Sequence, residues 1–444
     1  MSTWQDLVTA GLIGTERTGV PAVALPGLRS PADAPPDIPF PNNPVPDDPA
    51  VLLLDRAALL TVARRGGRPA DRVAPPPAAE PDPAPAVSPA AGRRLARMLG
   101  GEHAYLLTEW LAAAVTRGRR APAHLLPALL DRARRVTPTD PELRRLAAEA
   151  GGSRARWLAG HNPDWKFVTA QALAGDEAWR LGSASQRRAY LTALRARDPE
   201  AARELIAGSW AAATPDERLM FVNVMAVGLS LADEPLLEIA LDQGNAFARK
   251  RAAEVLAALP GSALARRMAE RARPCLREDR HWLHVSVPAE CDAAMRRDGI
   301  TPIPAAGGSP LRDRARLLLE LLARAPLRTW TDEFAMTPAE IVCLRSGDWA
   351  PVLFAGWSRA AIAQSAQDRS AWQWMAALIN RSLAGGLPGT AANAEMLGQL
   401  ARRADPALGA PGALPDPPPD APTVLQDAVR VLRFRYHMLK ELGA

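Results

Sequence analysis

The chain has 444 residues, long enough for two or three domains, and hydrophobic residues make up 48% of it. Its formal net charge of +6 favours acidic partners such as nucleic acid, but only three of its 54 basic residues are lysines, so a general preference for arginine weakens this indication. The chain lacks the roughly 18 consecutive apolar residues of a membrane span, a secretory signal pattern and enough cysteines for a disulfide framework, which predicts a cytoplasmic protein.

The first predicted element is a helix that runs into the heptapeptide GLIGTER, which starts at Gly11. A phosphate-binding Walker A loop needs two glycines separated by four residues and followed by a lysine. In GLIGTER the glycines are three positions apart and no lysine follows. We therefore expect Gly14 to end the helix in a left-handed conformation, and we interpret Glu16 and Arg17 as candidate contacts for a partner protein.

Further helices carry clear start signals. Ser88 and Thr214 each precede a proline and then an apolar run of helical spacing. Such a pair places a side-chain acceptor at the N-cap and a proline at the first helical position, where its missing N–H costs nothing. Glu217 follows Thr214 by three residues, which predicts a capping box.

Helix pairs dominate between residues 184 and 272. The dipeptides that start at Asp198 and Glu234 each open such a pair, and they are 36 residues apart. That spacing is typical of helix-hairpin repeats of the HEAT or TPR size, and the TPR consensus is absent. We predict an all-α fold of HEAT-like helical hairpin repeats, with a non-repetitive helical bundle as the alternative.

Three proline-rich stretches interrupt the helical pattern, at residues 19–49, 75–89 and 411–422. Proline at this density favours extended chain, so the first two stretches are predicted to be arms over the helical body or linkers. The expected organisation is N-terminal helices with proline-rich arms at 1–90, a HEAT-like repeat domain at 91–272, a strand and loop interlude at 273–310, and a tryptophan-rich helical domain at 311–444.

The interlude contains a predicted strand and a group of metal-ligand residues. The segment HWLHVSV (281–287) mixes apolar residues with His and Ser and is predicted to be a strand. Cys275, His281, His284 and Cys291 are the residue types of a zinc site. Their spacing matches no common zinc module, and the two histidines would point to opposite faces of the strand. We therefore expect no bound metal or cofactor.

The last predicted helix, residues 423–442, is strongly amphipathic. Its apolar stripe is expected to dock on the preceding helices. Its basic residues, Arg430, Arg433, Arg435 and Lys440, are expected to form a solvated edge. This edge is a candidate contact for a partner helix or for nucleic acid.

The chain has 12 tryptophans, and several of them recur in the last third, at Trp330, Trp349, Trp357 and Trp372. We expect these side chains to pack in the interior with their indole N–H groups hydrogen-bonded.

These helices, together with GLIGTER, RWLAGHNPDW (156–165) and VPAECDAAMRRDGI (287–300), resemble a bacterial protein family of unknown function. Members of that family are encoded beside a SWIM zinc-finger protein, a MoxR-type AAA+ ATPase and a von Willebrand factor A domain protein. The resemblance implies a helical accessory component of an ATPase-centred system, and it implies no catalytic residues.

The sequence thus predicts a non-catalytic scaffold or adaptor, because stacked helical repeats present extended surfaces. Its expected partner is an AAA+ ATPase, a von Willebrand A protein or a SWIM zinc-finger protein. The alternative is a nucleic-acid-binding protein, such as a HEAT-like DNA glycosylase with a basic concave face. A metal-dependent hydrolase is a third hypothesis.

Overall fold

The computed structural model describes residues 4–22, 47–66, 76–135, 141–169, 176–288, 290–300, 310–385 and 391–443. The chain forms two compact units, Met1–Ala78 and Ala79–Ala444. Both described parts are helical apart from one two-stranded hairpin, so the fold is all-α as predicted. Within these ranges, no helix is both long enough and apolar enough to cross a membrane.

The N-terminal unit consists of α1 (Trp4–Ile13), α2 (Thr15–Thr18) and α3 (Pro49–Gly66). Leu7 and Ala10 are the buried residues of α1, which packs against α3. Gly14 follows α1 with a φ of 102°, a backbone conformation open to glycine, so it ends the helix at the predicted position. The residues after it form the short helix α2. Most of the first proline-rich stretch, residues 23–46, lies outside the described residues.

In the larger unit an extended arm precedes the helices, and Ser88 caps the first of them by accepting a hydrogen bond from the Ala91 N–H. The arm is fixed to the helical body: Asp82 accepts a hydrogen bond of 2.9 Å from the Ser153 N–H, and Ala86 forms a β-bridge with Arg120. The second proline-rich stretch is therefore a packed arm over residues 79–88. The first helices are α4 (Pro89–Leu99), α5 (Leu107–Thr116), α6 (Leu126–Arg135) and α7 (Pro141–His161), with 3₁₀ turns η2 (Ala104–Leu106), η3 (Ala123–Leu125) and η4 (Pro163–Val168).

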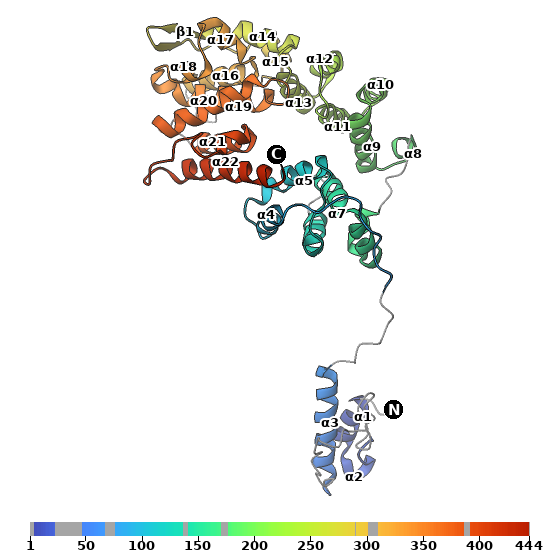
Figure 1. Cartoon of the computed structure of the whole chain (residues 1–444). Helices are drawn as coiled ribbons and strands as arrows, with labels where there is room; N and C mark the ends of the chain where they lie inside the picture. Colours follow the sequence, from blue (N-terminus) through green and yellow to red (C-terminus); the bar gives the residue numbers. More distant parts are fainter. Residues whose placement is uncertain are drawn as a thin grey trace. The chain divides into compact units, whose positions relative to one another are not determined.

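The middle helices match the run predicted for residues 184–272. The Thr214 capping box is present, with hydrogen bonds in both directions between Thr214 and Glu217. Their bounds are α8 (Asp176–Arg180), α9 (Ala184–Arg197), α10 (Pro199–Ser209), α11 (Pro215–Met225), η5 (Leu231–Asp233), α12 (Glu234–Gln243), α13 (Ala246–Ala257) and α14 (Ala263–Ala272). Consecutive helices such as α9 and α10, or α12 and α13, pack side by side (Figure 1). A HEAT-type repeat remains a prediction.

The predicted strand is one half of a β-hairpin. After η6 (Arg273–Cys275), β1 (Leu276–Asp279) pairs antiparallel with β2 (Trp282–Val285), and Asp279 lies opposite Trp282. The two residues between the strands, Arg280 and His281, both have positive φ, as in a type I′ turn. The sequence did not indicate β1, because its LRED sequence lacks β-branched and aromatic residues.

The last helices share one hydrophobic core with the middle helices. Leu237 and Met268 belong to the same core as Leu318 and Leu378, so the expected boundary at 273–310 does not separate two cores. Residues 301–309 of that interlude lie outside the described residues. The remaining elements are α15 (Ala293–Arg297), α16 (Pro310–Arg324), α17 (Arg328–Phe334), α18 (Pro338–Val342), η7 (Gly347–Trp349), α19 (Ala350–Gln364), α20 (Ser370–Gly385), α21 (Ala391–Arg403), η8 (Pro406–Gly409) and α22 (Thr423–Glu441).

Helix α22 connects the end of this unit to its beginning, as Figure 1 shows. Its first half contributes Leu425 and Leu432 to the large core. Its second half contributes Phe434 and Met438 to a second core formed by α4–α7. Arg94 on α4 binds the Glu441 carboxylate through two hydrogen bonds of 2.6 and 2.7 Å. The helical array is therefore closed on itself.

Of the four tryptophans expected in the interior, Trp349 and Trp372 are only half-buried against the core. Trp330 and Trp357 are buried, as is Trp374, which the sequence pattern did not single out. The indole nitrogens of Trp330 and Trp357 have no hydrogen-bond partner among the described residues, contrary to expectation. Ring contacts hold these side chains instead: Trp357 lies 5.4 Å from Trp374 between ring centroids, and Trp330 stacks on Phe334.

Candidate protein-interaction surface

The N-terminal unit exposes an apolar stripe along α3. In the helix segment VLLLDRAALLTV all residues but Asp55, Arg56 and Thr61 are apolar, and α3 packs on α1 and α2. The stripe repeats at helical spacing and is strongly exposed, with relative exposures of 68% at both Leu54 and Val62. Its members are Val51, Leu54, Leu59 and Val62.

Helix α1 adds a second exposed stripe. Trp4, Val8 and Leu12 follow one another at intervals of four residues, and Leu12 is 82% exposed. The buried residues of α1 are Leu7 and Ala10, and the stripe of Trp4, Val8 and Leu12 is exposed. We refer to the two stripes together as the α1–α3 apolar surface.

The two candidate contact residues of GLIGTER lie on α2 in the same unit. Glu16 and Arg17 are both exposed, and α2 packs on α1 and α3. Arg56 of α3 donates hydrogen bonds to the backbone carbonyls of Val20 and Pro21, at 2.6 and 2.5 Å, and so fixes the segment that follows α2. These contacts fix the GLIGTER segment within the N-terminal unit.

The basic residues of α22 do not form one solvated edge. Arg430 and Arg433 are exposed, and each pairs with an acid, Asp427 and Asp416 respectively. Lys440 is also exposed, with its ammonium 5.8 Å from the centre of the Tyr436 ring. Arg430, Arg433 and Lys440 therefore remain surface residues.

Arg435, by contrast, is only 5% exposed, which corrects the expected surface position. Its Nε and Nη2 donate to the Glu109 carboxylate of α5, at 2.8 Å for the shortest contact. Its Nη1 donates to the carbonyls of Ala401 and Ala404, at the end of α21. Arg435 thus ties α22 to two other helices, a role that hydrophobic periodicity cannot reveal.

The four candidate zinc ligands lie in different surroundings. Cys275 is buried, and burial raises the pKa of its thiol to about 11. His281 forms the hairpin turn, His284 lies on β2, and Cys291 directs its Sγ to the Ile300 carbonyl at 3.6 Å. Across the described ranges, no three histidine, cysteine or acidic side chains form a group able to hold a metal ion.

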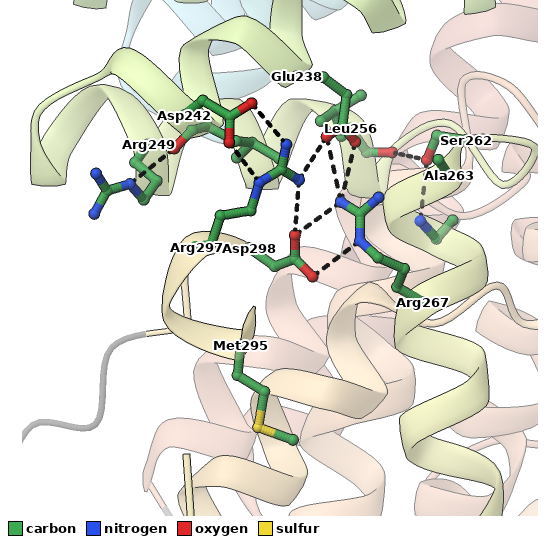
Figure 2. Close-up of polar contacts among 12 residues, drawn as sticks. Glu238, Asp242, Arg249, Leu256, Ser262, Ala263, Arg267, Met295, Arg297 and Asp298 are labelled. Carbon is green, nitrogen blue, oxygen red and sulfur yellow. Dashed lines mark hydrogen bonds and ion pairs between the residues drawn. The ribbon is translucent and has the colours of Figure 1, made fainter. Parts of the chain in front are cut away.

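The segment VPAECDAAMRRDGI ends in a buried ion network. Asp298 is 1% exposed and accepts hydrogen bonds from Arg267 (2.8 and 3.0 Å), Arg271 (2.7 Å) and Arg297 (3.1 Å). Burial raises the pKa of Asp298, but the hydrogen bonds from Arg267 and Arg271 outweigh this effect and hold the pKa below its usual value. Figure 2 shows Glu238 of α12 bridging Arg267 and Arg297.

Gly299, the residue after Asp298, also holds this segment against the helices. Its φ is +79°, and a Cβ at this position would lie 2.6 Å from the Ala253 Cβ on α13. Only glycine lets the chain approach α13 so closely. The segment therefore fixes the loop after the hairpin to α12, α13 and α14, which is a structural role.

The segment RWLAGHNPDW also has a structural role. Asn162 caps η4 by accepting a hydrogen bond from the Asp164 N–H. The Trp165 Nε1 donates a hydrogen bond of 3.0 Å to Asp131 on α6. The segment thereby closes a small core around Ala155 and Ala159.

These observations define an all-α protein in which the sequence motifs serve as anchors between helices. A model of the family of unknown function DUF5691 matches residues 6–408, and the chain belongs to this family. No curated protein and no solved structure matches the chain.

Proposed function

We propose that the protein is a non-catalytic adaptor, and that its α1–α3 apolar surface binds an amphipathic helix of a partner protein. The observation that carries this proposal is the exposure of two apolar stripes in one small unit. Exposed apolar patches mark interaction sites. The larger unit would then serve as the scaffold.

The charge of the surface favours a different protein over a second copy of this chain. Asp55 is exposed beside Leu54 and Leu59, inside the α3 stripe. If two copies paired along this stripe, in either direction, their Asp55 carboxylates would lie close together in an apolar contact, which is unfavourable. A partner helix with apolar residues and one Lys or Arg would complement the stripe.

The partner that we propose belongs to a MoxR-type ATPase and von Willebrand A system. This choice is supported by the sequence resemblance, which implies these proteins and a SWIM zinc-finger protein as genomic neighbours. In such a system an adaptor needs a binding surface and no chemistry of its own. The proposed site of action is the cytoplasm.

Co-purification of the full-length chain with each of these three proteins, expressed together, tests the proposal. We expect one of them to form a stable complex, and Leu54→Glu to weaken it about tenfold or more, because it places a charge in the apolar contact. Asp55→Lys should also weaken it, since it repels the basic residue of the partner. Leu181→Glu is the control, because Leu181 is 85% exposed and lies in the other unit.

Two results would contradict the proposal. In the first, a complex forms and Leu54→Glu binds as tightly as the wild-type chain. In the second, sedimentation shows that the wild-type chain self-associates and that Leu54→Glu abolishes this self-association, which would identify a second copy as the occupant.

A further inference from the structure

A cleft of about 890 Å³ lies in the larger unit, between α7 and η4 on one side and α9 and α11 on the other. Ligand sites typically enclose roughly 300–1,000 Å³. Of the sequence motifs discussed above, only RWLAGHNPDW reaches this cleft, through its first residue, Arg156. No motif brings the two sides of the cleft together, because α7 and η4 are distant in sequence from α11.

The rim of the cleft is basic. Four arginines line it, namely Arg144, Arg145, Arg156 and Arg188, against one acid, Glu149. Two of these arginines are held by neighbours that the structure shows. Arg145 lies between Glu142 and Glu149, at 2.8 and 2.6 Å. Arg144 donates hydrogen bonds to the carbonyls of Ala133 and Arg134 at the end of α6.

Arg156 differs from these two arginines. It is exposed on α7, and it forms no ion pair with any described residue. Its guanidinium is therefore available for a ligand, and a guanidinium binds a carboxylate through two parallel hydrogen bonds. Arg188 brings a further positive charge from α9, on the opposite side of the cleft.

The floor of the cleft is apolar. Val224 is buried at the end of α11, and Val227 and Val168 are half-buried beside it. Ala189 lines the same cleft from an exposed position on α9. Small and branched apolar residues of this kind accommodate aliphatic side chains.

We propose that this cleft binds a short peptide segment in which acidic and aliphatic residues alternate. Arg156 binds a carboxylate, the other rim arginines add positive charge, and the valines of the floor bury the aliphatic side chains, as in other arginine clusters that recognise acidic motifs. Single-stranded nucleic acid fits less well, because it needs several aromatic platforms for its bases. Phe167 is the one aromatic lining residue, and the Arg144 guanidinium already lies 5.6 Å from its ring centre.

The test measures the fluorescence anisotropy of a labelled peptide of alternating aspartate and leucine, titrated with the full-length chain. We expect binding that weakens with added salt. The Kd should be about tenfold higher or more for Arg156→Glu, which replaces one positive charge of the rim with a negative charge. Ala189→Glu should weaken binding similarly, because it places a carboxylate at the floor. Both residues are exposed, so both variants should retain the wild-type melting curve.

Three controls accompany the test. Arg154→Glu makes the same charge change on an exposed residue of α7 that does not line the cleft, and it should keep the Kd within about twofold. Peptides of aspartate with serine, and of lysine with leucine, should bind more weakly than the aspartate and leucine peptide.

The proposal is overturned if the aspartate and leucine peptide does not bind, or if Arg156→Glu binds it like the wild type. It is also overturned if a thymidine oligonucleotide binds more tightly and Arg156→Glu abolishes that binding.

Discussion

Buried and half-buried arginines share one use in this protein: they bind the carbonyl groups at the ends of helices. Arg195 binds the carbonyls of Val227 and Gly228, just after α11. Arg249 does the same for α12, and Arg435 for α21. The last carbonyls of a helix lack partners within the helix and carry partial negative charge, so a guanidinium with five donors satisfies them well. Part of the arginine excess is thereby explained by internal contacts.

Other arginines satisfy the buried carboxylate of Asp298, and we predict that Asp298→Asn lowers the free energy of unfolding by about 3–5 kcal/mol at pH 7. The variant leaves Arg267, Arg271 and Arg297 without their shared carboxylate. Urea unfolding measures this difference. Asp332→Asn, at an exposed position, is the control and should change the free energy by no more than about 0.5 kcal/mol.

The pH dependence follows from the direction of the shift. Because the pKa of Asp298 is lowered in the folded chain, its contribution is fully present above the unfolded pKa of about 3.9 and is lost as the pH falls through the lower folded value. The difference between wild type and Asp298→Asn should therefore shrink below about pH 4. A difference that is unchanged at pH 3 would show that the carboxylate charge is not what stabilises the network.

Among the elements, α22 carries an exposed arginine and a buried arginine within one turn. Arg433 pairs with Asp416 at the surface, where both side chains are about half exposed or more. Arg435 is buried against Glu109 and two carbonyls. The two residues share a helix and a residue type and differ in burial, so they form a matched pair.

We predict that Arg435→Ala lowers the free energy of unfolding by about 3–5 kcal/mol, because it leaves Glu109 and the carbonyls of Ala401 and Ala404 without their partner. Arg433→Ala should change it by no more than about 0.5 kcal/mol, as is usual for exposed ion pairs. Thermal and urea unfolding of both variants make the comparison. If both variants lose the same free energy of unfolding, the buried contacts of Arg435 stabilise the fold no more than the exposed ion pair of Arg433 does.

The helices were predictable because their start signals are local: Ser88 and Thr214 cap the helices that the sequence assigned to them. Strand β1 was missed because its turn uses Arg280 and His281 where glycine or asparagine is usual. The burial of Arg435 was missed because it depends on Glu109, which is 326 residues away in sequence. The α1–α3 surface was missed because an apolar residue gives no sign of whether another element covers it.

For the whole molecule, the net charge of +6 suggests nucleic-acid binding, and the arginine contacts argue against it. Arginines such as Arg195, Arg267 and Arg435 are committed to internal acids and carbonyls. We predict that duplex DNA binds only non-specifically, with a Kd of about 10⁻⁴–10⁻⁶ M at physiological salt and a strong salt dependence. Fluorescence anisotropy with a labelled duplex measures this. Nanomolar binding at the same salt, or excision of an alkylated base, would favour a glycosylase-like protein instead.

The closure of the larger unit by α22 has a consequence for protein synthesis. The core formed by α4–α7 includes Phe434, Met438 and Leu442. Arg94 of α4 pairs with Glu441, which lies 347 residues later in the sequence. At about 5–20 residues per second, a ribosome needs roughly 20–70 s to add that length of chain. During this interval the early helices lack the side chains that complete their core. A nascent chain that has not yet reached α22 therefore exposes an unfinished apolar surface to chaperones and proteases.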